Sequence, residues 1–125
     1  MKERRRCYRL QMELPVSFRA SKYQRHISLG LTQNISATGL CFLTTQGVEV
    51  GQELKLDIQI PPEQKLTLTT EVVWVRETGY ISRDYYIGVR LKEPVDEDAH
   101  QYVRFCAQSM HKLRQKREAG PAAEA

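Results

Sequence analysis

Hydrophobic and polar residues alternate along most of the chain, which predicts a series of β-strands that each bury one face. The alternating stretches lie at residues 11–20, 27–33, 40–44, 54–60, 66–75 and 86–91. Short polar segments separate them, and Pro61-Pro62 ends the clearest one, because proline cannot donate to a strand ladder. Many short antiparallel strands of this kind predict a mainly β fold, a barrel or a sandwich.

Some positions within these stretches refine the prediction. Pro15 removes a backbone donor, so we expect its strand to lie at an edge or to begin irregularly. Val73 and Val75 lie on the opposite parity from Val72, which suggests that this end of its strand is covered on both sides. Trp74 shares the parity of Val72, and a buried core tryptophan is the common outcome for such a position.

The period changes after Pro94 from two to that of a helix. Six apolar residues fall on one helical face: Ala99, Tyr102, Val103, Cys106, Met110 and Leu113. Acidic residues at 96–98 and basic residues at 112–117 follow the charge order that the helix dipole favours. We therefore predict a helix over residues 96–117 that packs on the sheet, and a flexible tail over residues 118–125.

The charge is concentrated at the N-terminus. The chain has 19 basic and 15 acidic residues, a formal net charge of +4. Residues 1–10 hold five basic residues and one acidic residue, so the remaining 14 of each sign cancel. The segment Arg4-Arg5-Arg6-Cys7-Tyr8-Arg9 supplies most of this excess. Arginine makes bidentate hydrogen bonds to phosphates and guanine edges and stacks on flat rings, so the segment indicates an anionic ligand. The alternative is a solvated basic tail.

Length and composition limit the class of protein. The 125 residues fit a single domain, with no apolar run long enough for a membrane span and no signal peptide. Three widely spaced cysteines, Cys7, Cys41 and Cys106, form neither a disulfide framework nor a metal pair, so we expect a cytoplasmic protein. His100 and His111 are about 16 Å apart by helix rise. No catalytic or metal set can be assembled, and we expect no enzyme and no cofactor.

A short polar segment follows the second predicted strand. It reads Asn34-Ile35-Ser36-Ala37-Thr38-Gly39, which is typical of a tight turn. Together with Arg5-Arg6-Cys7-Tyr8-Arg9, it resembles the paired RxxxR and (D/N)xSxxG signature of PilZ domains, bacterial receptors for the second messenger cyclic di-GMP. The segments at 71–76 and 87–91 also resemble later strands of such domains. The resemblance implies a single domain over residues 1–117. Its fold would be a six-stranded antiparallel β-barrel with a C-terminal helix.

The resemblance also implies roles for individual residues. Arg5 and Arg9 would clamp the phosphates and guanine faces of cyclic di-GMP, and Asn34 and Ser36 would hydrogen-bond a guanine. Gly39 would let the backbone approach closely.

Other implied roles concern the stoichiometry and the signal. Arg4, an extra arginine before the motif, goes in this family with a stacked pair of ligands, so two molecules per protomer are expected. Trp74 could stack on a guanine, and the contact of Arg6 stays open. The arm at residues 2–10 is expected to be mobile without ligand and to fold on binding. The protein is expected to be a monomer. An effector protein would then recognise the surface that the folded arm creates.

Two other functions compete with this interpretation. A small barrel with a basic arm can bind RNA or single-stranded DNA, but an aromatic run on a strand face is missing, which disfavours nucleic acid. Some PilZ proteins act as adaptors that bind no nucleotide. The intact motif residues of this chain argue against such a loss of nucleotide binding.

Overall fold

A computed structural model describes residues 9–19, 27–79, 83–92 and 95–124 of the chain. Its elements, in chain order, are β1 (Leu10–Gln11), β2 (Pro15–Arg19), β3 (Ser28–Ser36), β4 (Gly39–Thr44), β5 (Glu53–Ile60), β6 (Gln64–Glu77), β7 (Tyr85–Leu91) and α1 (Glu97–Glu124).

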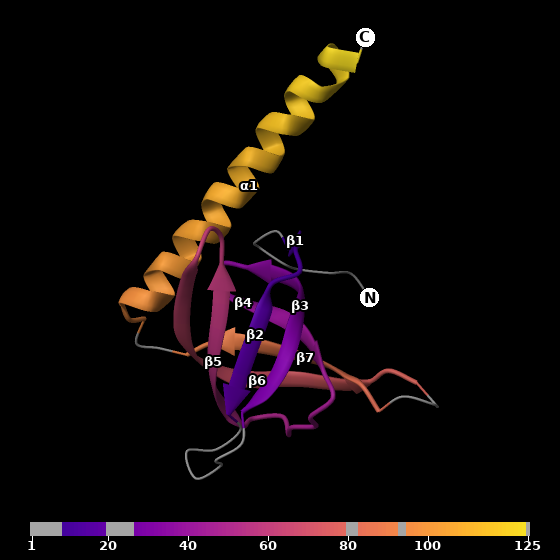
Figure 1. Ribbon diagram of the computed structural model, residues 1–125, viewed down its shortest axis with the longest axis vertical. Helices are drawn as coiled ribbons and strands as arrows, with labels where there is room; N and C mark the ends of the chain where they lie inside the picture. Colours follow the sequence, from indigo (N-terminus) through magenta and orange to yellow (C-terminus); the bar gives the residue numbers. More distant parts are fainter. Residues whose placement is uncertain (1–8, 20–26, 80–82, 93–94, 125) are drawn as a thin grey trace.

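The sheet closes into an antiparallel barrel. Its strands follow the order β1-β3-β2-β5-β6-β7-β4, and β4 pairs again with β3. Six strands therefore form a closed ring, and the two-residue β1 is an addition to β3 (Figure 1). This confirms the expected mainly β, six-stranded barrel with one C-terminal helix. Closure pairs both sides of every barrel strand, which removes the exposed edges of an open sheet.

The barrel interior holds the hydrophobic core that the alternation predicted. In β2, Val16 and Phe18 are buried while Arg19 is exposed, and in β5 the residues from Leu54 to Ile60 are buried at every second position. The rings of Phe18 and Phe42 meet across the interior with centroids 5.1 Å apart. Pro15 is the first residue of β2, a strand that pairs on both sides, so the irregular start is confirmed and the edge position is wrong.

Strand β3 is present as expected, but its leucines face outward. Leu29 is 73% exposed and Leu31 is 37% exposed. The cause is the register of β3 against β2, which places Leu29 opposite Ser17 and Leu31 opposite Pro15. Opposed residues in an antiparallel pair share a face of the sheet, so the burial of Val16 and Phe18 forces both leucines out.

Two β-bulges reverse the alternation near one end of the barrel. The first lies between Thr32 and Asn34, and the second lies between Val72 and Trp74. A bulge adds one residue to one strand and so turns the following side chains to the opposite face. Trp74 therefore leaves the interior and is only half-buried, which corrects the expectation from parity alone. Val73 is 47% exposed, so the expected cover is wrong for this residue, whereas Val75 is partly buried against the core.

Helix α1 packs on β6, β1 and β3 through the predicted apolar face. Ala99, Tyr102 and Cys106 are buried. Asp96 is the N-cap, because its carboxylate accepts a 2.9 Å hydrogen bond from the backbone N–H of Ala99. Figure 1 shows that the second half of the helix extends beyond the barrel. Within the described residues, the helix lacks the apolar length needed to cross a membrane.

Both ends of the domain differ from the boundaries predicted from sequence. The helix continues to Glu124 and does not end at 117, so the backbone of the expected tail is helical up to that residue. At the other end, Leu10 belonged to the expected arm but is buried in β1, where it pairs with Ile35. Arg9 is also described, and the rest of the arm, residues 2–8, lies outside the described residues.

Candidate functional site

A groove on the outer surface of the barrel collects the motif residues that the structure describes. It consists of two adjoining cavities of about 370 and 380 Å³. Both cavities are lined by Arg9, Asn34, Cys41 and Trp74. We call the two cavities together the outer groove.

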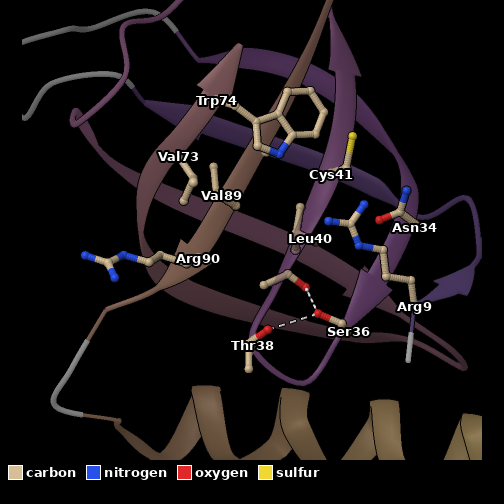
Figure 2. Close-up of a pocket in the computed structure, with 12 residues that line it drawn as sticks. Arg9, Asn34, Ser36, Thr38, Leu40, Cys41, Val73, Trp74, Val89 and Arg90 are labelled. Atoms are coloured by element: carbon tan, nitrogen blue, oxygen red, sulfur yellow. Dashed lines mark hydrogen bonds between the residues drawn. The ribbon is translucent and has the colours of Figure 1, made fainter. Parts of the chain in front are cut away.

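The bulge in β3 turns the second motif toward this groove. Before the bulge, Thr32 faces the interior and is fully buried; after it, Ile35 faces the interior, so Asn34 and Ser36 face outward. Pairing of β1 with β3 brings Arg9 to the same place. Figure 2 shows the Arg9 guanidinium beside the Asn34 amide, with Ser36 below them. The structure thus joins one residue of the arginine motif to two of the turn motif. Arg4, Arg5 and Arg6 lie outside the described residues.

Gly39 has a packing role in the turn. A Cβ atom at this position would lie 2.1 Å from the backbone oxygen of Val89 in β7, so only glycine allows the two strands to approach. The Gly39 backbone is not in the left-handed region. Its carbonyl oxygen accepts hydrogen bonds from the Ser36 hydroxyl (3.3 Å) and from the buried Tyr102 hydroxyl (2.8 Å). Tyr102 therefore connects helix α1 directly to the motif turn.

Trp74 lies flat against the outer surface of β7. It pairs with Gly88, and a Cβ atom on Gly88 would lie 2.2 Å from the indole nitrogen. The absence of a side chain at this position makes room for the ring. Cys41 is the partner of Gly88 on the other side, in β4, and it also lines the groove (Figure 2). A half-buried indole on this surface offers one face to a planar ligand.

The motifs did not reveal three further groove residues. Arg76 and Tyr86 line the second cavity, and the Arg76 guanidinium lies 5.3 Å from the centre of the Tyr86 ring. Cys41 was expected in the core, and it is buried, but it also forms part of the groove wall. Burial raises the pKa of the Cys41 thiol, while the charges of Arg9 and Arg76 oppose that rise. A glycine within a strand, as at Gly88, was the one sequence signal of a close approach here.

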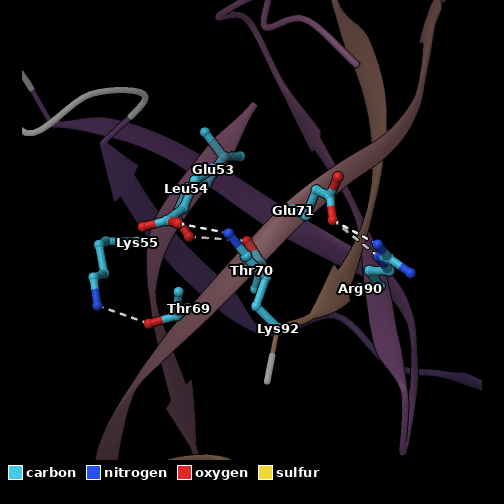
Figure 3. A network of polar contacts seen from close by, with 8 residues as sticks. All are labelled: Glu53, Leu54, Lys55, Thr69, Thr70, Glu71, Arg90 and Lys92. Carbon is cyan, nitrogen blue, oxygen red and sulfur yellow. Dashed lines mark hydrogen bonds and ion pairs between the residues drawn. The ribbon is translucent and has the colours of Figure 1, made fainter. Parts of the chain in front are cut away.

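The outer groove is positively charged. Arg9 and Arg76 line it, and no acidic side chain of the described part of the chain does so. Arg90 is also at its border, but Glu71 binds its guanidinium with a contact of 2.7 Å, and Figure 2 shows it directed away from Arg9. Figure 3 shows this pair beside a second surface pair, Lys92 with Glu53 at 2.9 Å. Guanidinium groups next to aromatic rings suit an anionic ligand with planar groups.

Comparison with known proteins identifies the family. The PilZ domain model matches residues 3–108, so this chain belongs to the PilZ domain family. A search of curated proteins found no matching sequence.

Solved structures of similar fold include several larger proteins. The inhibitor of motility MotI/DgrA of Bacillus subtilis matches at 20% identity and a TM-score of 0.68, over 89% of this chain and 53% of that one. The MrkH–c-di-GMP complex of K. pneumonia matches at 18% and 0.73, over 92% and 56%. YcgR of Escherichia coli in complex with c-di-GMP matches at 13% and 0.71, over 94% and 50%. The chain thus spans about half the length of these proteins.

Proposed function

We propose that this protein is a receptor for cyclic di-GMP, which it binds in the outer groove, and that it has a binding function and no catalytic one. One observation carries the proposal. Arg9 from the first motif meets Asn34 and Ser36 from the second at a single cationic groove. Membership of the PilZ family and the c-di-GMP complexes of MrkH and YcgR support the choice of ligand.

Each groove residue has a proposed contact. Arg9, with Arg5 from the arm, holds a phosphate and a guanine face through charge-assisted hydrogen bonds. Asn34 and Ser36 hydrogen-bond the edge of a guanine, and the Trp74 indole stacks on a guanine ring. Stacking on an aromatic side chain contributes about 1–3 kcal/mol per base.

We propose that two ligand molecules bind per protomer. Two cavities of similar volume adjoin at Trp74, and the second adds Arg76 and Tyr86 to the shared residues. An extra cation and an extra ring suit a second planar anion stacked on the first. Arg4, which precedes the first motif arginine, supports the same stoichiometry.

The signal would pass through the shape of the arm. We propose that residues 2–8 fold against the Asn34–Gly39 turn when the ligand neutralises the charges of the arm, and that an effector protein recognises the new surface. Amide hydrogen exchange tests this step. Slower exchange in residues 2–8 with ligand is expected, whereas equal rates with and without ligand would contradict it.

Isothermal titration of cyclic di-GMP tests the binding proposal. The wild type should bind at micromolar or tighter affinity, about −8 kcal/mol, with two ligands per protomer. Arg5→Ala/Arg9→Ala should abolish the heat. Arg19→Ala/Arg104→Ala is the matched control, because it removes the same charge from exposed positions outside the groove. No heat from the wild type would contradict the proposal and favour an adaptor that binds no nucleotide.

A further inference from the structure

The outer groove has an arginine whose charge an acidic neighbour neutralises. Arg9 lines both cavities of the groove, Arg76 lines only the second, and Arg90 lines only the first. Each cavity therefore has one arginine of its own beside the shared Arg9. The proposed contacts with cyclic di-GMP make no use of Arg90, because its guanidinium is paired with Glu71.

The register of β7 places Arg90 between an acidic residue and a glycine. Arg90 is opposite Glu71 in β6 and opposite Gly39 in β4. Gly39 has no side chain that could separate Arg90 from the motif turn. The first cavity spans this position, since it is lined both by Arg90 and by Ser36 of the turn. The guanidinium therefore has space on the side away from Glu71.

Arg90 is also close to the ring that we propose to stack on a guanine. It follows Gly88 by two residues in a regular part of β7, so both lie on the outer face, roughly 7 Å apart along the strand. The Trp74 ring lies against Gly88, and an extended arginine side chain is about as long as that separation. A phosphate attached to a guanosine in the first cavity would thus lie within reach of Arg90.

The ion pair between Arg90 and Glu71 is weak enough to be exchanged. The Nε and an Nη atom of Arg90 both donate to the same carboxylate oxygen, at 3.1 and 2.7 Å (Figure 3). A bidentate pair instead has two parallel hydrogen bonds to two oxygens. The Arg90 side chain is 65% exposed, and exposed ion pairs contribute little because water and salt screen them.

We propose that Arg90 is a further ligand-binding residue, and that its guanidinium exchanges the Glu71 carboxylate for a phosphate of cyclic di-GMP. A phosphate offers two oxygens to the planar guanidinium, so a bidentate contact replaces a contact with one oxygen. Glu71 is then an internal competitor that the ligand has to displace, and it lowers the affinity of the groove. The inference rests on the proposed function, because it adds a contact to the same ligand.

Titration calorimetry with cyclic di-GMP tests the exchange through two substitutions of opposite effect. Glu71→Gln removes the competitor and should strengthen binding about two- to fivefold, which corresponds to the contribution of an exposed ion pair. Arg90→Gln removes the contact with the phosphate and should weaken binding about tenfold, as for the loss of a hydrogen bond to a charged group. In the Arg90→Gln background, Glu71→Gln should have no further effect, because no guanidinium is left to release.

Glu53→Gln is the matched control for the loss of a negative charge. It removes the carboxylate of the neighbouring surface pair, in which Glu53 lies 2.9 Å from Lys92 (Figure 3). Neither residue of this pair lines the outer groove. The affinity of Glu53→Gln for cyclic di-GMP should therefore equal that of the wild type.

Arginine side-chain NMR detects the exchange directly. The Nε–H signal of Arg90 is the one that is missing from the spectrum of Arg90→Gln. Saturating cyclic di-GMP should shift this signal in the wild type, because a phosphate replaces the carboxylate as its acceptor. A signal that keeps its free position at saturation would overturn the exchange.

The outcomes separate this inference from the proposed function. Unchanged or weaker binding in Glu71→Gln, or wild-type affinity in Arg90→Gln, would overturn the exchange and leave the receptor proposal intact. An equal gain in Glu53→Gln, or an equal gain from Glu71→Gln in the Arg90→Gln background, would assign the effect to overall charge and would also overturn the exchange. A wild type that binds no cyclic di-GMP would overturn both proposals.

Discussion

Gly88→Ala separates the contribution of Trp74 to binding from its contribution to folding. The new methyl group would lie 2.2 Å from the indole nitrogen and 2.3 Å from a second ring atom, so the ring must leave the surface of β7. The indole is half-buried at the outer surface, where it can rotate toward solvent. The barrel core on the other face of the strand is left intact.

The expected change in stability is small. Moving the ring costs part of its apolar burial, on the scale of about 1–3 kcal/mol for an overpacked site. Replacing glycine by alanine lowers the conformational entropy of the unfolded chain, which stabilises the folded protein by about 0.4–1 kcal/mol. The free energy of unfolding should therefore fall by about 1 kcal/mol, as measured by urea denaturation. The affinity for cyclic di-GMP should fall about 5- to 150-fold, since stacking contributes about 1–3 kcal/mol per base.

Tryptophan fluorescence provides a specific assay, because Trp74 is the one tryptophan of the chain. Cyclic di-GMP should quench the emission of the wild type by stacking, and should leave that of Gly88→Ala unchanged. Gly79→Ala is the control, since no atom lies within 4 Å of a Cβ placed there. Wild-type affinity in Gly88→Ala without any quenching would refute the stacking role, because the ligand would then bind equally well with the ring displaced.

Three further predictions concern the motif turn and the groove wall. Tyr102→Phe removes a 2.8 Å hydrogen bond to the Gly39 carbonyl, and should lower the free energy of unfolding by about 1 kcal/mol in urea denaturation; an unchanged midpoint would argue against that contact. Gly39→Ala should cost about 2 kcal/mol or more in the same assay, because its Cβ would meet the rigid backbone of Val89 at 2.1 Å; a stable variant would show that the strands can separate there. Burial raises the pKa of the Cys41 thiol, so its alkylation, followed by peptide mass spectrometry, should accelerate at a pH above that of an ordinary thiol, and Arg9→Ala should move the midpoint higher by removing a charge that lowers this pKa. A lower midpoint in Arg9→Ala would contradict the electrostatic argument.

Local sequence was sufficient to locate the six barrel strands and the start of the helix. Alternation located the barrel strands because each strand buries one face, so that apolar and polar residues alternate along consecutive positions. The helix face from Ala99 to Cys106 was equally readable. The end of the helix was not, since the helix continues through Gly120-Pro121 to Glu124.

Sequence also identified the candidate ligand-binding residues, but not where their side chains point. The Arg9 and Asn34 motifs are local, and their types indicate an anionic, planar ligand. The two bulges decide that Asn34, Ser36 and Trp74 face outward, because each inserts one residue and reverses the faces that follow. Alternation alone would have placed Trp74 in the core.

Tertiary structure alone assembled the groove. The pairing of β1 with β3 carries Arg9 to Asn34, and the register of β7 against β6 places Gly88 beneath Trp74. Register between distant strands depends on which side chains fill the shared interior, as when Val16 and Phe18 force Leu29 outward. The sequence by itself determined the strands, the charge and the motifs. Only the packed barrel decided which face each residue presents, because that choice is made by partners far apart in the chain.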